Sequence, residues 1–117
     1  MTRRYAHQQR CPIARSLDIV GDRWTLLVIR DLARGHSRFA SLQHELRGIA
    51  PNMLSERLKL LEGEGLITSA LYSQHPPRAE YSLTEKGRAL VPVLDALAAW
   101  GTEHTSGGAA GVRTDGR

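Results

Sequence analysis

The apolar residues of this chain recur at helical spacing through its first half. Pro12 suits the first position of a helix, because its missing N–H needs no partner there, and that helix should end at Gly21. A second predicted helix, about residues 23–34, is apolar nearly all round, so it should be the central buried helix, and Asp22 can cap its start. A third helix begins near Phe39, and its apolar stripe runs into the turn that follows.

The fourth predicted helix divides into an apolar side and a polar side. It opens on Pro51 and stops at Gly65. At about 100° per residue, its leucines cluster on one side and its polar residues on the other. The apolar side holds Leu54, Leu58 and Leu61, and the polar side holds Asn52, Ser55, Glu56 and Lys59. The leucines should anchor the helix, which leaves the polar side free to meet a ligand.

After this helix the chain changes to strand character. Residues 66–72 and 79–83 are predicted strands, and Pro76-Pro77 marks the turn between them, because proline cannot extend a ladder. Thr84 is a suitable N-cap for a last helix, which Pro92 should kink or split. This order predicts a winged helix-turn-helix, a mainly α fold with a small β-hairpin. In such a fold one helix can enter the major groove of DNA while the hairpin tip reaches the backbone.

Composition fits one small domain. The chain has 117 residues, of which 41% are hydrophobic and 24% charged, as in ordinary soluble proteins. No apolar run approaches the roughly 18 residues that cross a bilayer. The single cysteine excludes an internal disulfide and agrees with a reducing cytoplasm, where we expect the protein to act. We expect a basic mobile arm at 1–10, the domain at 11–101 and a Gly-rich disordered tail at 102–117.

Positive charge is concentrated in two regions. Residues 1–15 hold four arginines and no acidic residue, and residues 34–59 hold five basic residues against two acidic ones. The second region contains the predicted helix-turn-helix. Such a distribution suits a polyanionic partner. Charge alone is also compatible with a solvated, arginine-rich surface that has no partner.

The polar side of the fourth helix carries residue types that can read DNA bases. Asparagine pairs with adenine, lysine with guanine and serine with either. In this helix Asn52, Ser55 and Lys59 stand at i, i+3 and i+7. Basic residues flank this helix and the hairpin turn, where phosphate contacts are expected. We therefore expect double-stranded DNA as the partner. The candidate contacts are Arg38, Asn52, Ser55, Arg57, Lys59, His75 and Arg78.

Other candidate chemistry is sparse. Cys11 stands at a helix N-terminus with Arg10 and Arg15 nearby, where the dipole and the cations should stabilise a thiolate able to sense oxidants or electrophiles. An inert, partly buried thiol is the alternative. The five histidines are scattered, so we predict no metal site and no cofactor. Nucleophile motifs and phosphate-binding loops are absent, and we do not expect an enzyme.

Five segments together resemble the HxlR-type winged-helix transcriptional regulators of bacteria. In the family's order, over roughly residues 11–101, they are CPIARSLDIVGDRWTLLVIRDL, RFASLQHEL, GIAPNMLSERLKLLEGEGLI, PPRAEYSLTEKGRAL and PVLDALAAW. The resemblance implies a dimer built from the first and last helices that binds a palindromic operator and represses or activates nearby genes. It also implies that the fourth helix enters the major groove and the wing meets the flank. Some relatives use a cysteine at the position of Cys11 to sense oxidants, quinones or aldehydes.

The chain departs from this family at two places. Ala50 stands where the family usually has Ser or Thr, so the fourth helix lacks that N-cap. The family often has a basic residue at the position of Asn52, and more arginine where this chain has Thr68, Ser69 and Ala70. We therefore expect weaker phosphate contact by the hairpin, which the basic arm can offset.

The last helix favours a homodimer on physical grounds as well. Its apolar stripe is longer than a small monomer needs to cover, and two copies about one DNA turn apart would double the contacts. The expected interface residues are Ile13, Leu17, Leu90, Val93, Leu94, Leu97 and Trp100. We expect a regulator, more readily a repressor than an activator. Two other interpretations stay open: a protein–protein interaction module, and a regulator that responds to a metal or small molecule.

Overall fold

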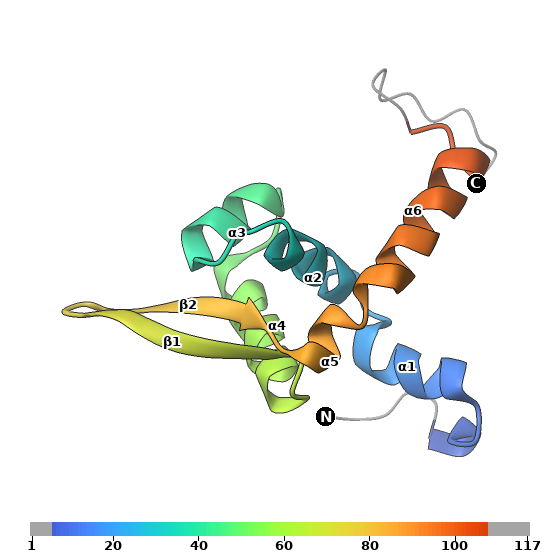
Figure 1. Cartoon of the computed structure of the whole chain (residues 1–117), viewed down its shortest axis with the longest axis horizontal. Helices are drawn as coiled ribbons and strands as arrows, with labels where there is room; N and C mark the ends of the chain where they lie inside the picture. The colour runs from blue at the N-terminus through green and yellow to red at the C-terminus, as the bar shows by residue number, and fades with distance from the viewer. Residues whose placement is uncertain (1–5, 108–117) are drawn as a thin grey trace.

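A computed structural model describes residues 6–107 of the chain. It confirms the predicted fold class, since a mainly helical domain carries a two-stranded antiparallel hairpin that projects from it (Figure 1). In chain order the elements are a 3-10 turn (Ala6–Gln8), α1 (Pro12–Val20), α2 (Thr25–Ala33), α3 (Phe39–Glu45), α4 (Pro51–Gly63), β1 (Ile67–Gln74), β2 (Pro77–Leu83), α5 (Glu85–Arg88) and α6 (Val91–His104). Within the described range, none of these helices is long and apolar enough to cross a membrane.

Side-chain hydrogen bonds mark the starts of α2 and α5 but not of α4. The Asp22 carboxylate accepts the backbone N–H groups of Trp24, at 2.9 Å, and Thr25, at 3.3 Å, as expected of a residue that caps α2. Thr84 caps α5 by accepting the Gly87 N–H at 3.1 Å. Ala50 precedes α4 without any side-chain cap, as its sequence predicts.

The hydrophobic core is centred on α2, as the pattern predicts. Val28 and Ile29 are fully buried, and the stripe that begins on α3 continues through Leu46 to Ile49 in the turn before α4. The core is completed by the leucines of α4 and the first residues after it. Its buried members are Val28, Ile29, Leu32, Leu42, Leu46, Ile49, Leu54, Leu58, Leu61, Leu66 and Ile67.

The hairpin is longer than its sequence predicts. The turn was expected to span residues 73–78, but β1 continues to Gln74 and pairs there with Pro77, the first residue of β2. Proline is tolerated at the first residue of a strand, so the prediction of a wider turn was wrong for a physical reason. The register also shifts between Leu71 and Ser73, which leaves Tyr72 without a partner in a β-bulge.

The last helical segment is split, as Pro92 predicts, into α5 and α6. At Gly87 the backbone of α5 lies so close to the Leu66 carbonyl that a side chain would collide with it. The α6 helix continues to His104, beyond the boundary predicted at residue 101. None of its residues is buried.

The N-terminal segment is described only in part. Gln9 donates a hydrogen bond to the Asp18 carboxylate at 3.1 Å and accepts one from the Arg15 guanidinium at 2.6 Å, so this part of the predicted arm is held against α1. Residues 1–5 of the arm, and residues 108–117 of the predicted tail, lie outside the described residues.

Candidate nucleic-acid interface

The orientation of α4 is set by its leucines. Leu54, Leu58 and Leu61 are at most 2% exposed, because they pack against the core centred on α2. Asn52, Ser55 and Lys59 are exposed on the opposite side, as predicted, and their side chains form no hydrogen bond or ion pair with another residue of 6–107. The helix therefore presents an unpaired polar face about two turns long.

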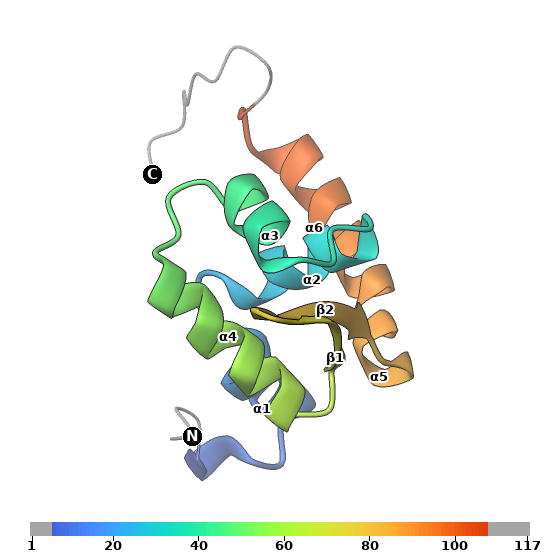
Figure 2. The ribbon, with the colours of Figure 1, turned by 90° about the vertical axis from the view of Figure 1, so that its left-hand side faces the viewer.

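The turn before α4 has the compactness of a helix-turn-helix. Gly48 adopts a φ of +91°, a conformation that residues with a side chain rarely adopt, and so lets the chain reverse directly after α3. Ile49 then inserts into the core at 5% exposure and fixes the angle between α3 and α4. Figure 2, viewed from the hairpin side, shows α4 lying beside the hairpin with α3 above it.

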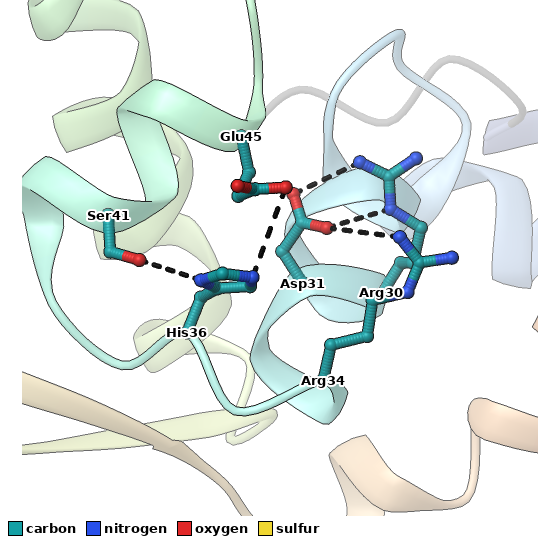
Figure 3. Close-up of polar contacts among 6 residues, drawn as sticks. All are labelled: Arg30, Asp31, Arg34, His36, Ser41 and Glu45. Atoms are coloured by element: carbon teal, nitrogen blue, oxygen red, sulfur yellow. Dashed lines mark hydrogen bonds and ion pairs between the residues drawn. The ribbon is translucent and has the colours of Figure 1, made fainter.

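A polar cluster that includes the buried Asp31 connects the end of α2 to α3 (Figure 3). Asp31 is fully buried and accepts two hydrogen bonds from Arg30, at 2.8 and 3.1 Å. Its backbone carbonyl accepts the His36 N–H at 3.0 Å. The His36 ring in turn contacts the Ser41 hydroxyl at 2.7 Å and lies 3.9 Å from the Glu45 carboxylate, both on α3. These contacts hold the helix-turn-helix against α2.

Arg57, predicted as a phosphate contact, is paired with carboxylates of the protein itself. Its guanidinium lies 3.5 Å from the Asp22 carboxylate and 3.6 Å from that of Glu56, and its side chain is only 20% exposed. The two carboxylates are close enough to attract its charge. Arg57 thus pairs the middle of α4 with the loop before α2 instead of standing free for a phosphate.

The hairpin tip carries the two predicted wing residues. His75 and Arg78 are exposed, and the turn between the strands is closed by a 2.9 Å hydrogen bond from the Ser73 hydroxyl to the Pro76 carbonyl. The tip projects beyond the helices (Figure 1). It is therefore free to contact a surface that lies alongside α4.

Arg38 is also engaged within the protein. Its guanidinium stacks over the Tyr72 ring, with Cζ 3.8 Å from the ring centroid, and its Nε donates to the Glu80 carboxylate at 3.1 Å. The sequence predicted a free phosphate contact here. The side chain is still 54% exposed, but two partners on the hairpin share its charge.

The residues predicted for a dimer interface fall into two groups. Ile13, Leu17, Val93, Leu97 and Trp100 are exposed large apolar side chains on α1 and α6, with Ile13 at 71% and Trp100 at 61%. These helices lie at the end of the molecule away from the hairpin tip (Figure 1). An open groove of about 690 Å³ separates α6 from α2.

Leu90 and Leu94 belong to the second group. Both are only partly exposed, because they pack against the core where α6 begins. They attach α6 to the rest of the domain, the exposed face of α6 starts beside them, and their part in a dimer interface stays a prediction.

Cys11 lies at the N-cap position of α1. Its thiol is partly buried, and its backbone N–H donates to the Gln8 carbonyl at 2.9 Å. The nearby Arg15 guanidinium bonds the Gln9 carbonyl. The thiol therefore stands where the chain enters the exposed α1 helix.

Sequence reasoning missed three polar residues that organise this interface. Asp31 was passed over within an apolar helix, although a carboxylate between apolar residues and next to an arginine is a recognisable sign of a buried ion pair. Tyr72 and Glu80 gave no such sign, because their partner Arg38 is far away in the sequence.

These features define a winged helix-turn-helix transcriptional regulator, and the comparisons with known proteins agree. The HxlR-like helix-turn-helix family model matches residues 19–108, so the chain belongs to this family. An uncharacterised HTH-type transcriptional regulator of Methanothermobacter thermautotrophicus is 38% identical over 96 residues, which are 82% of this chain and 73% of that protein.

Two solved structures are similar throughout the domain. PA1607, named only as a candidate transcription factor, is 41% identical with a TM-score of 0.75, and the match covers 83% of this chain and 67% of that one. The redox regulator HypR in its oxidised form is 33% identical with a TM-score of 0.74, and the match covers 82% and 99%.

The hydrogen bonds and the ion pair of Asp22 predict an acid-sensitive stability. Burial by itself would raise the pKa of Asp22, but hydrogen bonds from Thr25 and Trp24 and the charge of Arg57 together lower it below 3.8. A lowered folded pKa stabilises the protein above the unfolded value, and this contribution is lost as pH falls through the folded value. Asp22→Asn should therefore reduce the free energy of unfolding by about 1 kcal/mol at neutral pH.

The measurement is urea unfolding from neutral pH down to about pH 3. The gap between the wild type and Asp22→Asn should close only below pH 3.8, where the wild type also loses the charge. Glu103→Gln, at an exposed position near the end of α6, is the control. A gap that stays constant with pH would contradict the lowered pKa of Asp22.

Proposed function

We propose that this protein acts in the cytoplasm as a homodimeric repressor that binds an inverted-repeat DNA operator. The observation that carries the proposal is the unpaired polar face of α4 opposite three buried leucines. Asn52, Ser55 and Lys59 provide the side-chain types that recognise base edges in the major groove. A dimer seated across a promoter would repress transcription by blocking access to the DNA.

The wing supplies contacts outside the half-site. His75 and Arg78 are exposed at a tip that projects beyond the helices, where a flanking phosphate or the minor groove would lie. The basic residues of the N-terminal segment add to this charge; Arg3 and Arg4 lie outside the described residues.

Selection of bound duplexes from a random pool tests the proposal directly. Enrichment of two inverted half-sites about one helical turn apart would support a dimeric DNA-binding protein. Failure to enrich any sequence, together with a weak dependence of duplex binding on salt, would instead favour the alternative of a protein–protein interaction module.

Lys59→Ala tests base readout. If Lys59 pairs with a base, binding to the selected operator should weaken by about 1–3 kcal/mol and discrimination should relax at one base pair. The chain's other lysine, Lys86, donates to the Glu64 carbonyl and offers a control with the same change of charge. Equal weakening on every duplex would make Lys59 a phosphate contact.

The exposed apolar faces of α1 and α6 support the dimer. An apolar helix of 14 residues with none buried is unusual for a monomer, and a second copy of the same face would cover it. The groove between α2 and α6 adds an apolar wall, with Leu26, Leu27 and Leu97 among its lining residues.

Leu97→Glu should convert the dimer to a monomer, because a charge at this half-exposed position cannot be buried against a partner. Sedimentation equilibrium measures the change. Thr68→Glu, which adds the same charge on the exposed part of β1, should remain dimeric. A dimer that survives Leu97→Glu would place the interface elsewhere.

Redox control through Cys11 is a further part of the proposal, supported by the similarity to the redox regulator HypR and by the place of the thiol at the start of α1. With one cysteine in the chain, a disulfide must join Cys11 either to the Cys11 of a second subunit or to a small thiol. A thiol oxidant should lower operator affinity in the wild type and leave Cys11→Ser unchanged, as measured by fluorescence anisotropy. An equal response of both proteins would remove the thiol from the mechanism.

A further inference from the structure

We propose that Arg38 is a positioning residue, which acts on operator binding by holding the hairpin at a fixed angle to α4. On the hairpin, Arg38 is bound by Tyr72 and Glu80. This inference rests on the proposed function, because it explains how the same DNA interface is aligned. It replaces the expectation that Arg38 contacts a phosphate itself.

One guanidinium contacts both strands of the hairpin. Arg38 Cζ lies 3.8 Å from the centroid of the Tyr72 ring on β1, and its Nε lies 3.1 Å from the Glu80 carboxylate on β2. Arg38 is also the residue immediately before α3. The two contacts therefore link the start of the helix-turn-helix to both strands. We call this set of three side chains the wing clamp.

The backbone places the clamp at the edge of the sheet. Arg38 forms an isolated antiparallel bridge with Glu80, and the Tyr81 N–H donates to the Ser37 carbonyl at 2.7 Å. The segment before α3 thus runs along β2 like a very short third strand. A bridge at one edge would still let the hairpin pivot about that edge, whereas a side chain that reaches β1 resists the rotation.

The β-bulge gives Tyr72 its place in the clamp. If the register of Ile67 to Leu71 continued, Tyr72 would pair with Arg78, but the shift pairs Arg78 with Ser73 and leaves Tyr72 outside the ladder. Bulges redirect a side chain and increase the local twist of a strand. Here the redirected ring lies on the Arg38 guanidinium.

The clamp lies between a fixed base and a free tip. At the base, the Ser69 hydroxyl donates to the Glu62 carboxylate on α4 at 2.9 Å. Beyond Tyr72, the side-chain hydrogen bond of the described hairpin runs from Ser73 to Pro76 and closes the turn. The direction of Arg78 relative to α4 therefore depends on the last point where the hairpin is held, which is the clamp.

A charge-neutral variant separates positioning from direct contact. Tyr72→Leu removes the ring face and keeps every charged residue, and Tyr72→Phe keeps the ring face as the matched control. Ethylation interference on the selected operator first identifies the phosphates lost in Arg78→Ala. Arg38→Ala and Tyr72→Leu should lose the contacts to these same flanking phosphates. Their affinity for the operator should fall about two- to tenfold, as expected when a cation–π contact is removed.

Tyr72→Phe should keep the wild-type pattern. The proposal is overturned if Tyr72→Leu keeps all contacts to the flanking phosphates while Arg38→Ala loses a phosphate contact that Arg78→Ala keeps. That outcome would make Arg38 a direct phosphate contact.

Amide exchange in the free protein tests the clamp without DNA. The Tyr81 N–H, which bonds Ser37 across the clamped edge, should exchange about tenfold faster in Arg38→Ala and Tyr72→Leu than in the wild type or Tyr72→Phe. Unchanged exchange in both variants would overturn the clamp. Since no operator is needed, a wild-type protein that enriches no duplex would refute the proposed function while this measurement still decides the clamp.

Discussion

Burial of Leu54, Leu58 and Leu61 is the interaction on which the rest of the interface depends. Truncating a buried leucine to alanine typically costs about 2–5 kcal/mol, so rotation of α4 about its axis, which would expose all three, is strongly disfavoured. The polar contacts around α4 refine this placement. Arg57 fixes its middle to the loop before α2, and Glu62 fixes its last turn to β1.

Hydrophobic periodicity was sufficient to predict α2, α3 and α4, because each of these helices contributes apolar residues at helical spacing to the core. The helix starts at Pro12 and Pro51 and the break at Pro92 follow from the same chemistry. The hairpin length could not be predicted in this way. Proline is excluded from strand interiors but accepted at a first strand position, and the sequence does not distinguish Pro77 from a turn residue.

The candidate site was predictable in its helix and less so in its arginines. Asn52, Ser55 and Lys59 are exposed because their positions on α4 follow from those of the leucines. Arg38 and Arg57 have long side chains whose acidic and aromatic partners come from other elements, so spacing along the chain cannot reveal them. For Leu90 and Leu94 the pattern identified an apolar face, but only the packing shows that these two residues contact the core of the domain.

The contact at Gly87 joins the two ends of the molecule. The Leu66 carbonyl lies directly against the backbone of α5 and also accepts the Thr84 N–H at 3.0 Å. Here main chain meets main chain, without a pliable side chain between them to absorb a shift. A tilt of α6 would therefore move the end of α4 as well, and in the dimer proposed above this movement would couple the contact between subunits to the spacing of the two α4 helices.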